Sequence, residues 1–259
     1  PSLSLRPGWT EQPIEDVRRM FFDYTRLTEP VLRRVMAYYY ATISQIDHHV
    51  GRILDLLKTR GLYDNTLVLY TSDHGEYLGF HHMLLKGGPM YDPLVRTPLL
   101  VKYPRQVRAG ERNAGLVSHV DVAPTLLGAA QLDVPETWPG VDLADETAGY
   151  DCVFAENRGG ASYMARSRTG KLLWNRGGPC RFFDLAADPL EQQDLYDDPA
   201  RHAEIAAHKQ ALAEWALFGA PTPPYVDEGA ARCKAPNVPA LEDDHRQRSV
   251  RYFRQKMAN

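Results

Sequence analysis

The feature that most constrains the fold is a long amphipathic helix pattern that leads into a short apolar strand pattern. Thr28 can cap a helix that begins with Glu29 and Pro30 and ends near Gly61. The run 66–71 that follows is nearly continuous in β-prone residues, which favours an inner parallel strand covered on both faces. A helix followed by a buried strand predicts an α/β layer. The apolar stripe of the helix consists of Val31, Val35, Tyr39, Ile43, Ile46, Val50, Ile53, Leu54 and Leu57.

The remaining elements indicate a change of architecture along the chain. A second strand pattern spans residues 98–103, and Asp121 can cap a helix that continues through Leu127. Short strand patterns separated by glycine-containing turns then favour an antiparallel sheet, and Asp198 begins a last helix that prolines end at 221–224. The predicted strands of this sheet are 151–155, 163–167, 171–174 and 180–185. The expected domains are an α/β domain at 1–149, a sheet-and-helix subdomain at 150–220 and a tail at 221–259.

Composition excludes several classes of partner. The chain has 259 residues, 44% of them hydrophobic, with 30 Lys and Arg against 33 Asp and Glu and a net charge of -3. Without a basic excess, nucleic acid is not an expected partner. No run approaches the roughly 20 apolar residues that cross a bilayer, and the given residues contain no signal segment, so no membrane is expected. Compartment and oligomeric state stay unassigned.

The densest polar cluster, residues 71–76, follows the predicted strand 66–71 directly. Ligand sites of open α/β sheets lie at the carboxyl ends of strands. Asp73 offers a carboxylate and His74 an imidazole to one divalent ion, and Gly75 lets the chain turn. The alternative is that Asp73 only caps the next segment.

A glycine-rich loop follows with His81, Lys86 and Arg96. A lysine beside a divalent cation suits a tetrahedral oxyanion, because both stabilise negative charge on sulfate or phosphate oxygens. His81 could protonate a leaving group or hydrogen-bond the oxyanion. Taken alone, Lys86 is also compatible with a solvated surface charge, His81 with a structural loop histidine, and Arg96 with tying the loop down.

Together these segments resemble the C-terminal half of a sulfatase, in the branch of the alkaline phosphatase superfamily that includes arylsulfatases and phosphonate monoester hydrolases. The resemblance covers about residues 30–197. It implies part of an alkaline-phosphatase-like sandwich, a mostly parallel sheet with flanking helices, followed by a small antiparallel C-terminal subdomain. The matching segments are 39–47, 50–54, 62–66, 71–79, the Gly-x-His at 79–81 followed by Lys86, 96–99, 121–127, 183–185, 188–191 and 194–195.

The resemblance also implies roles for the site residues. Asp73 and His74 would be ligands of one divalent metal, Lys86 would bridge the sulfate or phosphate group and the nucleophile, and His81 would assist. Calcium is the expected metal, with magnesium or manganese as alternatives, since an imidazole ligand suits manganese somewhat better. The family's nucleophile is a formylglycine that lies before the metal loop. Neither Cys233 nor Ser162 has the required surrounding motif or position, so the formylglycine is expected outside this segment.

The sequence therefore predicts a metal-dependent sulfuric ester hydrolase whose substrate is a small-molecule or saccharide sulfate ester. The given segment alone is expected to be inactive. One alternative is a phosphonate or phosphate mono- or diester hydrolase on the same scaffold. An alternative of another class is a non-catalytic sulfatase-like fragment or assembly module.

Overall fold

A computed structural model describes residues 28–136, 138–145, 147–157 and 162–219. Residues 1–27 and the predicted tail 221–259, with the proline break at 221–224 and Cys233, lie outside the described residues. Within the described part, no helix combines the length and the apolar character that a membrane span requires.

The predicted long helix is confirmed as α2 (Glu29–Thr59), but the Thr28 side chain at its N-cap position makes no capping hydrogen bond. Its predicted apolar stripe is not buried in the part of the chain that the structure describes. Leu32 and Met36 are the buried residues of α2, whereas Val31, Ile43 and Ile46 of the stripe are exposed. Periodic apolar positions mark a face that a helix can bury, but the segments that cover that face decide which residues become buried.

The two strands of the first layer are β1 (Val68–Thr71) and β2 (Leu99–Lys102), and they pair antiparallel with Tyr70 opposite Leu100. The expectation of a parallel neighbour is wrong for this pair. Tyr70 and Leu100 are also 37% and 61% exposed, so one face of the pair is open. An apolar run reports what a strand could bury and carries no information about the direction of its partner.

Short helices precede, connect and follow these strands. They are η3 (Tyr63–Asn65), η4 (Phe80–His82), α3 (Asp92–Val95), η5 (Pro104–Gln106), η6 (His119–Asp121) and α4 (Val122–Ala129). The predicted helix at 121–127 is confirmed as α4, but the Asp121 side chain does not cap it. Buried Asp121 instead accepts the Ser118 N–H at 2.7 Å in the capping box of η6.

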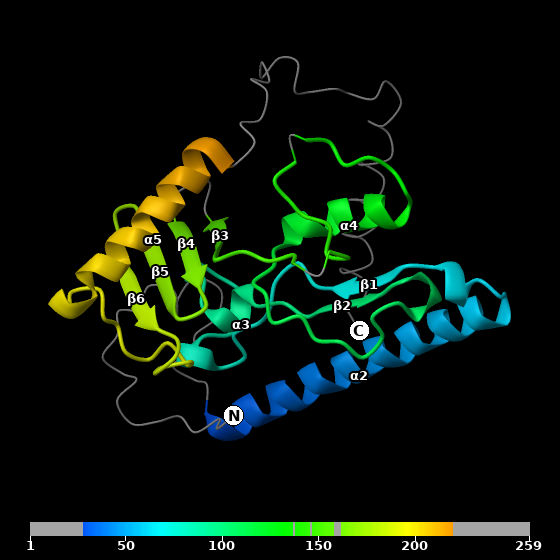
Figure 1. Ribbon diagram of the computed structural model, residues 1–259. Coiled ribbons are helices and arrows are strands. Elements are labelled where there is room, and N and C mark those ends of the chain that lie inside the picture. The colour runs from blue at the N-terminus through cyan, green and yellow to red at the C-terminus, as the bar shows by residue number, and fades with distance from the viewer. Residues whose placement is uncertain (1–27, 137, 146, 158–161, 220–259) are drawn as a thin grey trace, which may run out of the picture. The chain divides into compact units, whose positions relative to one another are not determined.

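The predicted antiparallel sheet is confirmed, with four strands in sequence order, β3 (Cys152–Asn157), β4 (Ser162–Ser167), β5 (Gly170–Asn175) and β6 (Arg181–Asp184). After η7 (Pro199–Arg201), helix α5 (His202–Glu214) packs against β4 and β5, as Figure 1 illustrates, and continues into a π turn, η8 (Trp215–Gly219). Helices and sheets together give the α/β class that the sequence predicts.

Alternating side chains give this sheet two buried faces. On one face, Ala165, Leu172 and Phe182 pack in one cluster with Ile205 and Leu212 of α5. Successive residues of a strand point to opposite faces, so the residues next to these three in the sequence lie on the second face. That face packs against the loop segment 77–94, and the cluster there consists of Tyr77, Met83, Met90, Tyr91, Leu94, Met164, Leu173, Phe183 and Leu185.

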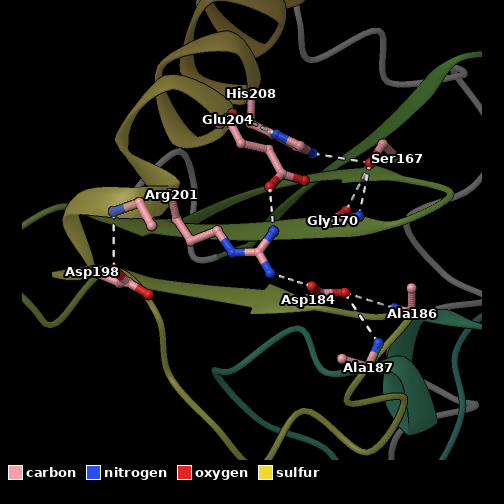
Figure 2. Close-up of polar contacts among 10 residues, drawn as sticks. Ser167, Gly170, Asp184, Ala186, Ala187, Asp198, Arg201, Glu204 and His208 are labelled. Atoms are coloured by element: carbon pink, nitrogen blue, oxygen red, sulfur yellow. Dashed lines mark hydrogen bonds and ion pairs between the residues drawn. The ribbon is translucent and has the colours of Figure 1, made fainter.

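Polar contacts also hold α5 and its N-terminal turn on the first face (Figure 2). The Arg201 guanidinium pairs with Asp184 of β6 and lies 3.1 Å from Glu204 Oε2. Buried His208 places Nε2 3.2 Å from Ser167 Oγ of β4, while its Nδ1 donates to the Glu204 carbonyl at 2.8 Å. The sheet therefore holds α5 at two places, at the turn before its first residue and at His208 in its middle.

A cluster of four charged residues, two of them buried and two partly buried, joins the second face to α3. Lys171 of β5 is fully buried, with Nζ 2.9 Å from Asp92 Oδ1 and 2.7 Å from Glu191 Oε1. Arg166 of β4 donates to both carboxylate oxygens of Asp92, at 3.1 and 3.0 Å. Two cations face two carboxylates, so the charges balance inside the core.

A substitution at Gly170 tests how tightly the sheet packs against α5. A Cβ at this position would lie 2.8 Å from Glu204 Oε1, 2.9 Å from His208 Cε1 and 3.0 Å from Phe182 Cζ. Gly170→Ala is therefore expected to lower the free energy of unfolding by about 1–3 kcal/mol through overpacking, measured by denaturant titration. Gly178→Ala is the matched control, since its Cβ would meet only Asn175 Cβ at 3.7 Å. Equal stabilities of the two variants would contradict this account of the interface.

Candidate active site

The loop after β1 is held by a close backbone approach at Gly75. The Gly75 N–H donates to the Leu94 carbonyl at 2.7 Å, and a Cβ on Gly75 would lie 1.9 Å from the Pro93 carbonyl oxygen. Gly75 is not among the residues with positive φ. The glycine is therefore needed for the approach of α3, and the expected role in a sharp turn is corrected.

The structure brings Asp73, His74 and Lys86 together at this loop. The Lys86 Nζ lies 3.1 Å from His74 Nε2, and Asp73 Oδ2 lies 3.4 Å from the same nitrogen. The His74 Nδ1 lies 2.8 Å from the Gly75 carbonyl oxygen. A carbonyl oxygen only accepts, so Nδ1 carries the proton and a neutral His74 presents the lone pair of Nε2.

This donor set fits a cation. An imidazole lone pair and a carboxylate oxygen face the same space, and a positive charge between them satisfies both. A backbone carbonyl that fixes the tautomer of a histidine is the usual support of a metal-binding imidazole. In the described residues, however, no group of three or more His, Cys, Asp and Glu is placed to hold a metal ion. Within the described residues, Asp73 and His74 thus supply two donors to this space, and no third carboxylate, imidazole or thiolate joins them.

Two hydrogen bonds of Tyr77 hold the segment around Lys86 close to the loop that carries His74. The Tyr77 N–H donates to the Leu85 carbonyl at 3.1 Å, and its phenol donates to the Pro89 carbonyl. Lys86 lies between these two acceptors, and its side chain is exposed. The local backbone thus places Lys86 opposite a residue that precedes it by 12 positions.

His81 lies apart from this group, in the core. It is 6% exposed and stacks on Tyr91, with ring centroids 4.5 Å apart. Burial, and next the positive charge of Arg181, lower the pKa of His81 to about 4. The imidazole is therefore neutral at pH 7. Its expected part in catalysis stays a prediction, and this placement favours a packing role.

Two further polar residues near the site have no signal in the local sequence pattern. His119 lies with Nε2 3.1 Å from Thr97 Oγ1 and 3.4 Å from Thr71 Oγ1, at the end of β1 where the loop with Asp73 and His74 begins. Asn157, at the end of β3, donates to the backbone just after Lys86. Both act across long sequence separations.

The Sulfatase family model matches residues 6–132. An arylsulfatase of Clostridium perfringens is 31% identical over 180 residues, which are 65% of this chain and 37% of that protein. An N-acetylglucosamine-6-O-sulfatase of Bacteroides thetaiotaomicron is 32% identical over 199 residues, which are 70% of this chain and 35% of that protein.

Among solved structures, the crystal structure of a phosphonate monoester hydrolase of Agrobacterium radiobacter matches with a TM-score of 0.64 and 28% identity. The match covers 73% of this chain and 42% of that one. The chain thus spans well under half the length of these relatives.

The buried His81 predicts a pH dependence of stability. Because its folded pKa of about 4 lies below the ordinary value of 6.5, only the unfolded chain takes up a proton as the pH falls through 6.5. Stability is therefore lost toward pH 4. His81→Phe keeps an aromatic ring on Tyr91. Between pH 7 and 4.5, the unfolding free energy of this variant should fall by about 2 kcal/mol less than that of the original protein. Denaturant titrations at both pH values measure this difference, and parallel losses in the two proteins would contradict it.

Proposed function

The chain belongs to the sulfatase family, whose model matches residues 6–132. We therefore propose that the whole protein is a metal-dependent sulfuric ester hydrolase. Its relatives include sulfatases from two bacteria, which supports sulfate ester hydrolysis at the level of the family. The observation that carries the proposal for this chain is the convergence of Asp73, His74 and Lys86 on one point, with the distances of 3.1 and 3.4 Å given above.

In this proposal Asp73 and His74 hold the divalent metal. Such an ion, when bound, stabilises negative charge on the oxygens of a sulfate ester. Calcium is the expected ion, with magnesium or manganese as alternatives, because a carboxylate suits all three and the imidazole suits manganese best. His74 contributes a fixed Nε2 lone pair, since its Nδ1 proton is engaged by the Gly75 carbonyl.

Lys86 supplies a second positive charge to the anionic group. Its exposed ammonium lies beside His74 and can donate to a sulfate oxygen while staying within reach of the metal ligands. A preorganised cation at the place where charge develops lowers the barrier without reorganisation during the reaction. We assign to Lys86 the role of binding and orienting the sulfate group beside the nucleophile.

The nucleophile of the proposed reaction is a formylglycine in the part of the sulfatase length that this chain does not span. Ser162 is a poor substitute, because it lies buried in β4 and its surroundings lack the family's motif. The given segment alone is therefore expected to be inactive.

The proposed substrate is a sulfate ester of a small molecule or a saccharide. The similarity to an N-acetylglucosamine-6-O-sulfatase supports the saccharide class.

Hydrolysis of phosphonate or phosphate esters is the second candidate. The likeness to a phosphonate monoester hydrolase, at a TM-score of 0.64, favours it specifically. Lys86 and a divalent ion would serve either tetrahedral anion. A non-catalytic role is less well supported, because packing alone gives no reason for an exposed lysine, a histidine and an aspartate to converge.

A comparison of esters separates the two catalytic candidates. The metal-loaded whole protein is expected to hydrolyse 4-nitrophenyl sulfate with a higher kcat/KM than 4-nitrophenyl phosphate or a phenylphosphonate ester. Initial rates at a common pH measure the three values. A higher value for either phosphorus ester would replace the sulfatase proposal by the second candidate.

Variants test the residues within whichever activity is found. Lys86→Ala is expected to lower kcat by about 10²- to 10³-fold, as the loss of a charge-stabilising donor does. Lys58→Ala is the matched control, since Lys58 pairs with exposed Asp55 at 3.5 Å on α2, and should keep the original rate. Asp73→Ala should in addition weaken metal binding in a calorimetric titration. Full activity of both Lys86→Ala and Asp73→Ala would favour the non-catalytic role.

A further inference from the structure

The backbone that follows Lys86 has few means of holding its own position. Gly87 and Gly88 carry no side chains that could pack, and glycine has the widest conformational freedom. Pro89 has no N–H to donate. The position of Lys86 therefore depends on contacts that other segments make with the carbonyl oxygens of this stretch.

Asn157 makes two such contacts with one amide group. Its Nδ2 lies 3.1 Å from the Gly87 carbonyl oxygen and 3.1 Å from the Gly88 carbonyl oxygen. An amide nitrogen carries two protons, so both carbonyls can be served at once. The two acceptors are the first two carbonyls after Lys86.

The anchor is part of a regular sheet. Asn157 ends β3 and pairs with Ser162 of β4, so it shares the face of Ser162 and Met164, which packs against the loop segment 77–94. On the other side of Lys86, the Tyr77 N–H holds the Leu85 carbonyl at 3.1 Å. Lys86 is thus bracketed by two fixed acceptors.

We propose that Asn157 is a positioning residue for Lys86, fixing the backbone from which the ammonium reaches His74. This inference rests on the proposed role of Lys86 in ester hydrolysis. Without the two donors, the Gly87 and Gly88 carbonyls turn to water and the lysine samples a wider volume. Misplacement of a reacting group by about 1 Å can cost about 10²-fold in rate.

The sharpest variant is Asn157→Asp, which keeps the size of the side chain but replaces both donors by a carboxylate oxygen facing two carbonyls. In the whole metal-loaded protein, kcat is expected to fall by about 10- to 100-fold, with a smaller change in KM. Asn175→Asp is the matched control. Asn175 also pairs with Ser162 and donates to a backbone carbonyl, that of Pro179 at 2.6 Å.

A double-mutant cycle separates positioning from general stabilisation. If Asn157 acts through Lys86, Asn157→Asp should cost little or nothing further in kcat when Lys86 is already alanine. A residue that merely supports the fold would lower kcat by the same factor in both backgrounds. Such additivity, or a loss in Asn175→Asp as large as in Asn157→Asp, would overturn the inference.

Hydrogen exchange gives a readout that does not depend on the proposed reaction. Amides in a peptide covering residues 84–90 are expected to exchange faster in Asn157→Asp than in the original protein or in Asn175→Asp. If the protein hydrolyses neither sulfate nor phosphorus esters, the proposed function fails while this measurement still decides whether Asn157 holds the loop. Unchanged exchange would overturn the positioning role.

Discussion

The buried pairing of Lys171 with Asp92 and Glu191 is the constraint on which the arrangement of the site depends. Burial alone would raise the pKa of Asp92, but the charges of Lys171 and Arg166 outweigh it and lower this pKa to about 2. The carboxylate is therefore ionised at any ordinary pH and holds α3 on the sheet. Because the Leu94 carbonyl of α3 accepts the Gly75 N–H, the position of the loop with Asp73 and His74 depends on an ion pair formed with β5. Removing one partner would leave an uncompensated charge in the core, which typically costs about 3–5 kcal/mol.

The sheet from β3 to β6 links this ion pair to the rest of the subdomain, because its two faces contact different segments. One face binds α5 through apolar residues and through contacts such as Arg201 with Asp184. The other face carries Arg166 and Lys171, which are paired in register, and Asn157 at the end of β3. A strand cannot shift on one face without shifting on the other, since successive side chains alternate. The covering helix therefore also stabilises the face that holds the loop segment 77–94.

The sequence predicted most elements for local reasons, and it singled out Asp73, His74 and Lys86, which the structure brings together. Helical periodicity located α2, alternation and glycine turns located the four-stranded sheet, and the run 71–79 carried the family resemblance that the comparisons confirm. The antiparallel pairing of β1 with β2 and the exposed stripe of α2 were not predicted, because direction and covering are properties of partners distant in sequence. The burial of His81 follows from its stack on Tyr91, and no spacing rule in a loop reveals which side chain turns inward. Asn157 and Asp92 act across about 70 positions, beyond the reach of any local pattern.

The surroundings of Lys86 combine two features that usually oppose each other, a solvated charge and a restricted position. The exposed ammonium of Lys86 avoids the cost of taking a charge out of water, but a long exposed side chain retains many rotamers. Burying it would restrict the rotamers at the expense of the charge. Fixing the backbone on both sides removes much of the positional freedom while the charge stays solvated. Leu85, held by Tyr77, and Gly87, held by Asn157, provide this fixation from two separate segments of the chain. Neutral hydrogen bonds to the main chain thus hold the backbone on both sides of Lys86 and leave its ammonium beside His74.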